Sequence, residues 1–311
     1  MADPVVEAIG VSKSYEGVTA LDGVSFTVGS GEVFALVGPN GAGKTTLMRL
    51  LTDILRPDGG QVRLFGNSRI RASLSRVGYM PEERGLYRGL TALDTVSYFA
   101  RLKGLSAADA RRGAERALEA VGMAGHAKRK LEELSKGMSQ RVQFAATLAH
   151  GPDLLILDEP FSGLDPVSSR RLQELVQERH EAGTTVLLST HNMEHAERLC
   201  QRLLMLHRGQ VRLYGSIAEI KARYVDHALL VECDGPVPGI AGVRHEALGP
   251  HAARLYPQDG ARRRDVLAAL LAAGADVRRF EPEEPTLEDI FVRVAGTEGE
   301  RDLRETMAAA V

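Results

Sequence analysis

The sequence predicts an α/β fold with a mixed sheet core, an inserted helical subdomain and a small α+β domain at its C-terminal end. Short apolar runs alternate with helical stretches, an Ala-, Arg- and Leu-rich helical segment interrupts them, and the pattern changes near Tyr224. We expect a core domain at residues 1–224 with its helical subdomain at about 90–150, a second domain at 225–296 and a tail at 297–311.

Net charge, cysteine positions and the length of the apolar stretches argue against a nucleic-acid-binding protein, a disulfide-rich protein and a membrane-spanning protein. The net charge of -2 gives no general attraction to nucleic acid. Cys200 and Cys233 lie far apart without a partner motif, so we expect neither a disulfide framework nor a metal site. No signal segment follows Met1, and the apolar stretch from Val266 to Ala273 is much shorter than the roughly 20 residues that cross a bilayer. We therefore expect a cytoplasmic protein that reaches a membrane only through a partner.

The first element of the core is a phosphate-binding loop (P-loop) between a strand and a helix. The apolar run Val33–Val37 predicts a strand buried on both faces, and Lys44 to Asp53 has helical spacing, with Ile54 continuing the apolar face. Glycines let backbone amides and the helix dipole surround phosphate groups, Lys44 can reach the β- and γ-phosphates, and Thr45 can ligate Mg²⁺. A purely structural glycine-rich turn is the alternative. The candidate phosphate-binding residues are Gly38, Pro39, Asn40, Gly41, Ala42, Gly43, Lys44, Thr45 and Thr46.

A second buried strand ends in two carboxylates. The apolar run Leu154–Leu157 leads directly into Asp158 and Glu159, and nucleotide sites lie at the carboxyl edge of parallel sheets. Asp158 suits Mg²⁺, and Glu159 can orient and deprotonate an attacking water. Alone, this pattern could be a plain strand end, but after a P-loop it indicates nucleotide hydrolysis.

The remaining elements follow the same alternation. We expect one more buried strand in the core, two helices around it, and a C-terminal domain with two strands and one helix. These segments are Val167–Ala182, Thr185–Ser189, Met193–Leu199, Ala228–Glu232, Arg262–Ala273 and Val277–Phe280.

Residues Leu134 to Gln140 open another helical stretch, for which Ser135 or Ser139 would be a good N-cap. This segment resembles the signature sequence of ABC transporter ATPases. Further matches come in the family's order: an aromatic residue before the P-loop, a Q-loop, a D-loop and a switch histidine. They are Tyr15, the segment 78–82, the segment 162–165 and His191.

The resemblance covers about residues 5–220 and implies the P-loop NTPase fold of an ABC cassette. It implies an ATPase in which Tyr15 stacks on adenine and His191, with Lys44, steadies the γ-phosphate. It also implies that a second cassette, identical or related, closes the site. The residues that would close it, facing ATP from that second cassette, are Ser135, Lys136, Gly137, Met138 and Asp165.

Two departures from the usual motifs indicate one subgroup of this family. Lys136 and Met138 stand where Gly and Gln are usual, and Glu82 replaces the Q-loop glutamine. These variants, and the segment 281–291, are similar to ATP-binding subunits of ABC-2-type exporters. The resemblance implies ATP and Mg²⁺ as cofactors, with Glu82 beside Thr45 and Asp158. It also implies an integral membrane permease as partner, a position on the inner face of the cell membrane through that permease, and no nucleic acid.

Several alternatives stay open. A soluble ABC ATPase acting on ribosomes or DNA lacks support because no paired cassette, long coiled coil or basic surface is visible. The signature segment and His191 disfavour a P-loop kinase or GTPase, and Lys44 with Glu159 disfavours a non-hydrolysing cassette. Tyr15 could be only a strand aromatic, and Glu82 could pair with a surface arginine such as Arg84 or Arg88.

Overall fold

The computed structural model describes residues 4–83, 85–224, 228–257, 262–296 and 306. The chain divides into two compact units, which we call the cassette unit (1–217 with 294–311) and the C-terminal unit (218–293). The boundaries predicted from the sequence were 224 and 296. No described helix is long and apolar enough to cross a membrane.

A six-stranded mixed sheet forms the centre of the cassette unit, in the order β5-β6-β7-β3-β8-β9. All neighbours are parallel except β9, which runs antiparallel to β8. The three apolar runs identified in the sequence are the fully buried strands β3, β6 and β7. The strand bounds are β3 Val33–Val37, β5 Val77–Met80, β6 Leu154–Leu157, β7 Thr185–Thr190, β8 Arg202–His207 and β9 Gln210–Ser216.

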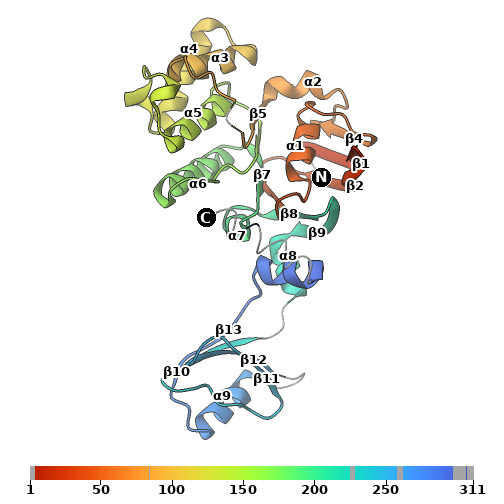
Figure 1. The fold of residues 1–311 in the computed structure, drawn as a ribbon, viewed down its shortest axis with the longest axis vertical. Helices are drawn as coiled ribbons and strands as arrows, with labels where there is room; N and C mark the ends of the chain where they lie inside the picture. Colours follow the sequence, from red (N-terminus) through yellow and green to blue (C-terminus); the bar gives the residue numbers. More distant parts are fainter. Residues whose placement is uncertain (1–3, 84, 225–227, 258–261, 297–305, 307–311) are drawn as a thin grey trace. The chain divides into compact units, whose positions relative to one another are not determined.

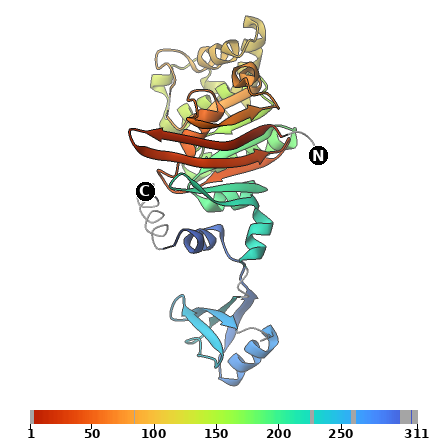
Figure 2. The same ribbon diagram turned by 90° about the vertical axis from the view of Figure 1, so that its right-hand side faces the viewer.

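A second, antiparallel sheet in the order β2-β1-β4 was not predicted. Its strands are β1 Val6–Tyr15, β2 Val18–Val28 and β4 Gly59–Leu64. It shares one hydrophobic core with helix α1 (Lys44–Leu51) and one face of the central sheet, whose other side carries α5 and α6 (Figure 1). Figure 2 shows the long β1 and β2 strands side by side. The predicted helical face was too long, because α1 ends at Leu51, Asp53 has a positive φ of 56° and Ile54 is 57% exposed.

Three capped helices form the inserted subdomain. Side-chain oxygens of Thr91, Ser106 and Ser135 accept hydrogen bonds from the first turns of these helices, so each helix start is satisfied. Their apolar faces pack together through residues such as Val96, Ala114 and Phe144. The helices of the cassette unit are α1, α2 Ile70–Ser73, α3 Ala92–Leu102, α4 Ala107–Ala120, α5 Lys136–Leu148, α6 Pro166–Glu181 and α7 Met193–Leu199, with short 3-10 turns at Leu74–Arg76, Ala124–His126 and Leu131–Glu133.

The C-terminal unit is α+β, as predicted. Four antiparallel strands lie in the order β11-β12-β10-β13, and α9 packs its Val266 and Leu270 against Leu229, Val231 and Leu255 of the sheet. The predicted strands and helix correspond to β10, β13 and α9, whereas β11 and β12 were not expected. The bounds are α8 Ile217–Arg223, β10 Leu229–Cys233, β11 Val243–Ala247, β12 Ala252–Pro257, α9 Arg263–Ala272 and β13 Val277–Pro282, with residues 287–293 also helical.

Candidate active site

The P-loop is held tightly by its surroundings, which explains two of its glycines. A Cβ on Gly38 would lie 2.2 Å from the carbonyl oxygen of Leu206, and one on Gly43 would lie 2.5 Å from that of Ala20. Gly43 also has a φ of 106°, a conformation that favours glycine. The loop therefore passes between β8 and β2 with no room for a side chain at Gly38 or Gly43, and it leads directly into α1.

Lys44 is buried and lies back against its own loop. Its Nζ donates to the carbonyl oxygens of Gly38 at 2.7 Å and Pro39 at 3.2 Å, and it lies 3.3 Å from Oε1 of Glu159. The ammonium is thus satisfied by oxygens that a phosphate group could replace. This contact also joins the P-loop to the end of β6.

Ser189, at the end of β7, connects the two carboxylates. Its hydroxyl donates to Oδ1 of Asp158 at 2.6 Å and accepts from the backbone N–H of Glu159 at 2.9 Å. Glu159 has a φ of 47°, which is costly for a residue with a side chain. The strained backbone turns Glu159 away from the strand and toward Lys44 and His191. The sequence analysis assigned no such role to Ser189.

His191 completes a buried network around Glu159. Its Nδ1 lies 3.0 Å from Oε2 of Glu159, while Lys44 lies beside the other oxygen. Burial disfavours ionisation of Glu159, but the hydrogen bond from His191 and the charge of Lys44 outweigh it, so the pKa of Glu159 lies below its ordinary value. Glu159 is therefore ionised near neutral pH and can accept a proton.

Asp158 and Glu82 face a common cavity of about 220 Å³, which Thr45 also lines. Burial raises the pKa of Asp158, although the hydrogen bond from Ser189 and the nearby Thr45 hydroxyl offset part of the effect. Partial burial, with Asp158 and Glu159 nearby, also raises the pKa of Glu82. Crowded carboxylates of this kind favour a bound cation. No ion pair joins Glu82 to a described arginine, and Arg84 lies outside the described residues.

These residues fit a magnesium ion. Oδ2 of Asp158 is buried and has no hydrogen-bond partner among the described residues, as expected for an oxygen that binds a cation. Thr45 supplies a second hard oxygen at the same point. Within the described part of the chain, no group of three His, Cys, Asp or Glu side chains is arranged to hold a metal. Mg²⁺ bound here would thus take its other ligands from water and from substrate phosphates, which is usual for this ion.

The signature segment lies apart from this network, at the start of α5. Ser135 is the N-cap of α5, since its Oγ accepts from the N–H of Met138 at 3.3 Å. Lys136 packs over Gly163 of the D-loop, and Gly137 lies against Leu164. Asp165 caps α6 by accepting from the N–H groups of Val167 and Ser168. Figure 1 shows α5 and α1 on opposite sides of the central sheet.

Two glutamines of α5 tie the signature helix to the loops around the site. Gln140 donates to the carbonyl oxygen of Pro160 at 2.8 Å, just after Glu159, and Gln143 donates to that of Pro81 at 2.9 Å, beside Glu82. The sequence analysis assigned neither contact. The two glutamines are three residues apart and therefore lie on one face of α5, which precedes the strand that ends in Asp158 and Glu159. This spacing was the feature of the sequence that could have indicated these contacts.

Two contacts lie at the edge of the site. Tyr15 is exposed at the end of β1, with Nζ of Lys13 5.8 Å from its ring centroid, so its ring is accessible for stacking. At the other end of the chain, the hydroxyl of Thr306 accepts a hydrogen bond of 3.1 Å from the N–H of Asn40 in the P-loop. Thr306 is buried. The rest of the predicted tail lies outside the described residues.

Comparison with known proteins identifies the family to which the chain belongs. Residues 21–162 match the ABC transporter family, and residues 215–295 match the C-terminal domain of DrrA1-3-like ATP-binding proteins. The chain is 36% identical to the Nod factor export ATP-binding protein I of Paraburkholderia xenovorans, over 96% of this chain and 99% of that protein. It is 33% identical to the daunorubicin/doxorubicin resistance ATP-binding protein DrrA of Streptomyces peucetius, over 94% and 92% of the two chains.

A solved structure supports the same assignment. The dimeric post-hydrolysis state of an ATP-binding cassette bound to ADP and Pi matches with a TM-score of 0.63 and 26% identity, over 68% of this chain and 98% of that one. Residues 215–295 have a family match of their own. The chain therefore belongs to the ABC transporter family, as an ATP-binding and ATP-hydrolysing subunit that resembles the ABC-2-type exporter group.

Proposed function

We propose that this ATPase works as one of two paired cassettes and powers export through a separate membrane permease. The single observation that carries the proposal is the buried network of Lys44, Glu159 and His191 beside Asp158. Export is favoured because similar proteins carry names that refer to Nod factor export and to daunorubicin/doxorubicin resistance. Such a protein would work in the cytoplasm, on the inner face of the membrane.

Hydrolysis at this site would begin when the γ-phosphate replaces Glu159 as the partner of Lys44 and His191. Lys44 and His191 both contact Glu159, and a γ-phosphate competes for both because it carries more negative charge than a carboxylate. Releasing them raises the proton affinity of Glu159, which then takes a proton from the attacking water. Thr45 and Asp158, with Glu82 nearby, would hold Mg²⁺, whose positive charge would stabilise the developing charge on the phosphates.

The signature residues would act on the ATP of the second cassette. Ser135 and Lys136 are exposed, and the N-terminal end of α5 carries the partial positive charge of the helix. A second copy, or a related cassette, would bring these groups to the phosphates held by Lys44. Two composite sites would then form between two chains.

Mixing two inactive variants tests this arrangement. Ser135→Arg should bind ATP but not hydrolyse it, and Lys44→Ala should bind ATP poorly. In a mixed dimer, one site combines an intact P-loop with an intact signature, so partial phosphate release should return. If the two proteins form mixed dimers, as measured with distinct tags, and no activity returns, closure from the second cassette is contradicted.

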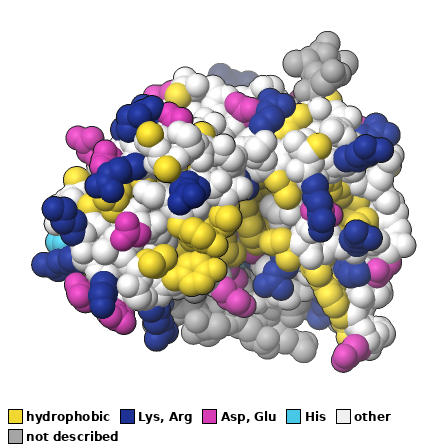
Figure 3. Space-filling model, turned by 90° about the horizontal axis from the view of Figure 1, so that it is seen from above, with side chains coloured by type: hydrophobic (Ala, Val, Ile, Leu, Met, Phe, Trp, Pro, Cys, Tyr) yellow, Lys and Arg dark blue, Asp and Glu magenta, His cyan; other side chains and the backbone are white. Residues whose placement is uncertain are grey.

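An exposed apolar surface next to the Glu82 loop suits the permease. We call Tyr87, Leu90, Tyr98 and Leu102 the docking patch, since all four are large, apolar and exposed. Figure 3 looks onto this end of the molecule and shows hydrophobic side chains gathered among Lys and Arg side chains. Exposed apolar patches of this kind mark binding surfaces for protein partners.

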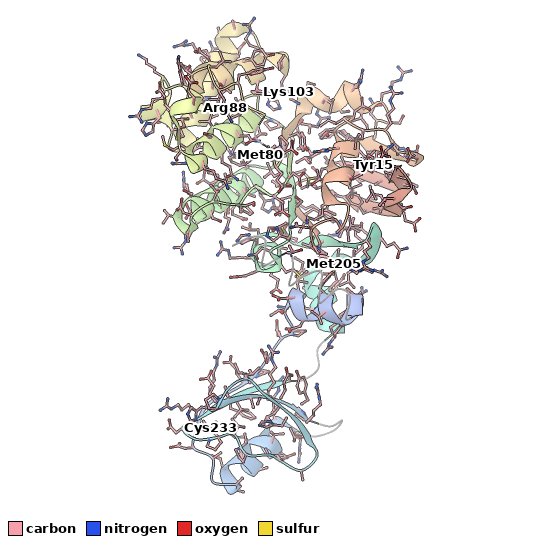
Figure 4. The ribbon with its side chains drawn as sticks, viewed as in Figure 1. Tyr15, Met80, Arg88, Lys103, Met205 and Cys233 are labelled. Carbon is pink, nitrogen blue, oxygen red and sulfur yellow. The ribbon has the colours of Figure 1, made fainter. Side chains whose placement is uncertain are left out.

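A pocket of about 130 Å³, which we call the docking pocket, lies beside the patch and is lined by Phe99, Lys103, Gln143 and His150 among others. Figure 4 shows Lys103 at the end of α3, further from the centre of the sheet than Met80 of β5. An amphipathic segment of the permease could insert an apolar side chain here. Because Gln143 also holds the Glu82 loop, insertion would act on the active site.

A charge placed in the patch tests the docking proposal. We expect Leu102→Glu to prevent co-purification with the proposed membrane permease, while the free cassette keeps its ATPase rate. Leu271→Glu is the matched control, because Leu271 is similarly exposed (56% against 63%) and lies on α9 of the C-terminal unit. Equal recovery of the membrane protein with both variants would count against the patch.

A further inference from the structure

The chain directly after β5 forms part of the wall between two cavities of the cassette unit. One is the docking pocket, and the other, which we call the metal-side cavity, is lined by Thr45, Glu82 and Asp158 among others. Pro81 and Gly85 line both cavities, whereas Glu82 lines the metal-side cavity and not the docking pocket. A group that holds this stretch from the docking-pocket side can therefore set where the Glu82 carboxylate lies.

Gln143 of α5 lines the docking pocket and is bonded to this stretch of chain. Its Nε2 donates to the carbonyl oxygen of Pro81 at 2.9 Å and to that of Glu83 at 3.3 Å. The side-chain amide carries two N–H groups, so each carbonyl can take one of them. These carbonyls belong to the residues directly before and after Glu82, and the two contacts therefore fix the peptide units on both sides of it.

The amide of Gln143 has a fixed position and is shielded from water. Gln143 is only 5% exposed, and its neighbours on α5, Val142 and Phe144, are fully buried. A buried carbonyl that loses its donor is left unsatisfied, which costs more than the loss of a hydrogen bond in water. The two contacts thus hold the chain around Glu82 more firmly than surface contacts would.

We infer that Gln143 is a positioning residue for Glu82: its amide holds the two neighbouring peptide carbonyls and so keeps the Glu82 carboxylate in the metal-side cavity. The inference rests on the proposed role of Glu82 at the magnesium site. It deepens that role by naming the group through which the docking pocket regulates the site. A partner side chain that enters the docking pocket meets Gln143 and thereby changes the affinity for Mg²⁺.

Gln143→Met tests the inference, because methionine has a similar length and lacks the N–H donors. Gln173→Met is the matched control. Gln173 lies on α6, is 4% exposed, donates to Oγ of Ser169 at 3.1 Å and lines neither cavity. The control therefore loses a hydrogen bond from an equally buried glutamine without touching the chain around Glu82.

Two measurements on the purified full chain need no hydrolysis. Hydrogen–deuterium exchange of the backbone amides around Glu82 should become faster in Gln143→Met and stay unchanged in Gln173→Met. Calorimetry with the non-hydrolysable analogue β,γ-imido-ATP, at a series of free Mg²⁺ concentrations, gives the concentration at which the metal half-maximally enhances nucleotide affinity. Gln143→Met should raise this concentration about threefold to tenfold. With EDTA in place of Mg²⁺, its affinity for the analogue should equal that of the wild type.

The EDTA measurement and the Glu82→Gln background separate positioning from a merely structural role. In the Glu82→Gln background, Gln143→Met should add no further shift, because the residue being positioned has lost its charge. General loosening of the cassette would instead weaken analogue binding with and without Mg²⁺, and it would add the same shift in both backgrounds. Either of those results overturns the inference.

The remaining failures point to different claims. If Glu82→Gln shifts the Mg²⁺ dependence and Gln143→Met does not, or if Gln173→Met shifts it equally, the inference about Gln143 is overturned while the magnesium site stands. If Glu82→Gln itself causes no shift, the proposed role of Glu82 fails and the inference fails with it. Should Gln143→Met fold poorly, Gln143→Leu removes the same donors and must give the same faster exchange and the same shift.

Discussion

Glu159→Gln is the sharpest test of the active site, because it removes a charge and keeps the shape. General-base assistance contributes about 10²- to 10⁴-fold, so the loss of phosphate release should correspond to about 2.7–5.4 kcal/mol in the barrier. ATP binding should not weaken. Lys44 lies 3.3 Å from the carboxylate in a buried site, an attraction of about 5 kcal/mol at an effective dielectric constant near 20, much of it offset by desolvation. Removing the charge leaves Lys44 freer to contact phosphate.

The assay has three parts: phosphate release, ATP affinity by titration calorimetry, and gel filtration in Mg·ATP. We expect slow release, unchanged or tighter ATP binding and an accumulated dimer, since hydrolysis is what reopens the proposed pair. Glu174→Gln, an exposed carboxylate on α6, is the control for loss of one negative charge. Phosphate release near the wild-type rate in Glu159→Gln would refute the assignment of Glu159 as the base.

Three further predictions follow from the same structure. Lys44→Ala should weaken ATP binding about tenfold to a hundredfold through loss of charge-assisted contacts, and an unchanged calorimetric affinity would contradict the P-loop assignment. Glu82→Gln should remain an ATPase but need more free Mg²⁺ for its half-maximal rate; curves that superimpose on the wild type would leave Glu82 with a surface or docking role. Burial, with the Lys103 charge nearby, lowers the pKa of His150 to about 4 in the folded protein. Between roughly pH 6.5 and pH 4 this histidine therefore binds more protons in the unfolded chain than in the folded one, so the free energy of unfolding decreases as the pH falls. His150→Gln should weaken this dependence of the free energy of unfolding on pH, measured by denaturant titration at several pH values. If the wild type and the variant lose stability in parallel as the pH falls, His150 does not contribute.

The geometry around Glu159 was largely predictable because the motifs that meet there follow buried strands. Asp158 and Glu159 follow β6, and His191 follows β7, its parallel neighbour, so the carboxyl edge of the sheet brings them together. The bridging hydroxyl of Ser189 was not predictable. A serine at a strand end is common, and only the positive φ of Glu159 turns that backbone N–H toward it.

The three central strands were predictable from the sequence, whereas the second sheet was not. Continuous apolar runs identified β3, β6 and β7, but β1 and β2 expose many side chains and contain irregular register shifts. Their alternating pattern is therefore broken, and no periodicity signal survives. The end of α1 was misjudged for a related reason: a left-handed residue at Asp53 terminates the helix, and composition alone does not distinguish it.

The contact between Thr306 and Asn40 has a practical consequence for purification. An affinity tag attached to the chain after Thr306 would be joined to a residue whose hydroxyl is bonded to the phosphate loop. Such a tag, particularly a charged or metal-binding one, could compete with nucleotide or displace Thr306. Affinities for ATP and Mg²⁺ should therefore be measured after the tag has been cleaved, with the tagged protein as a comparison.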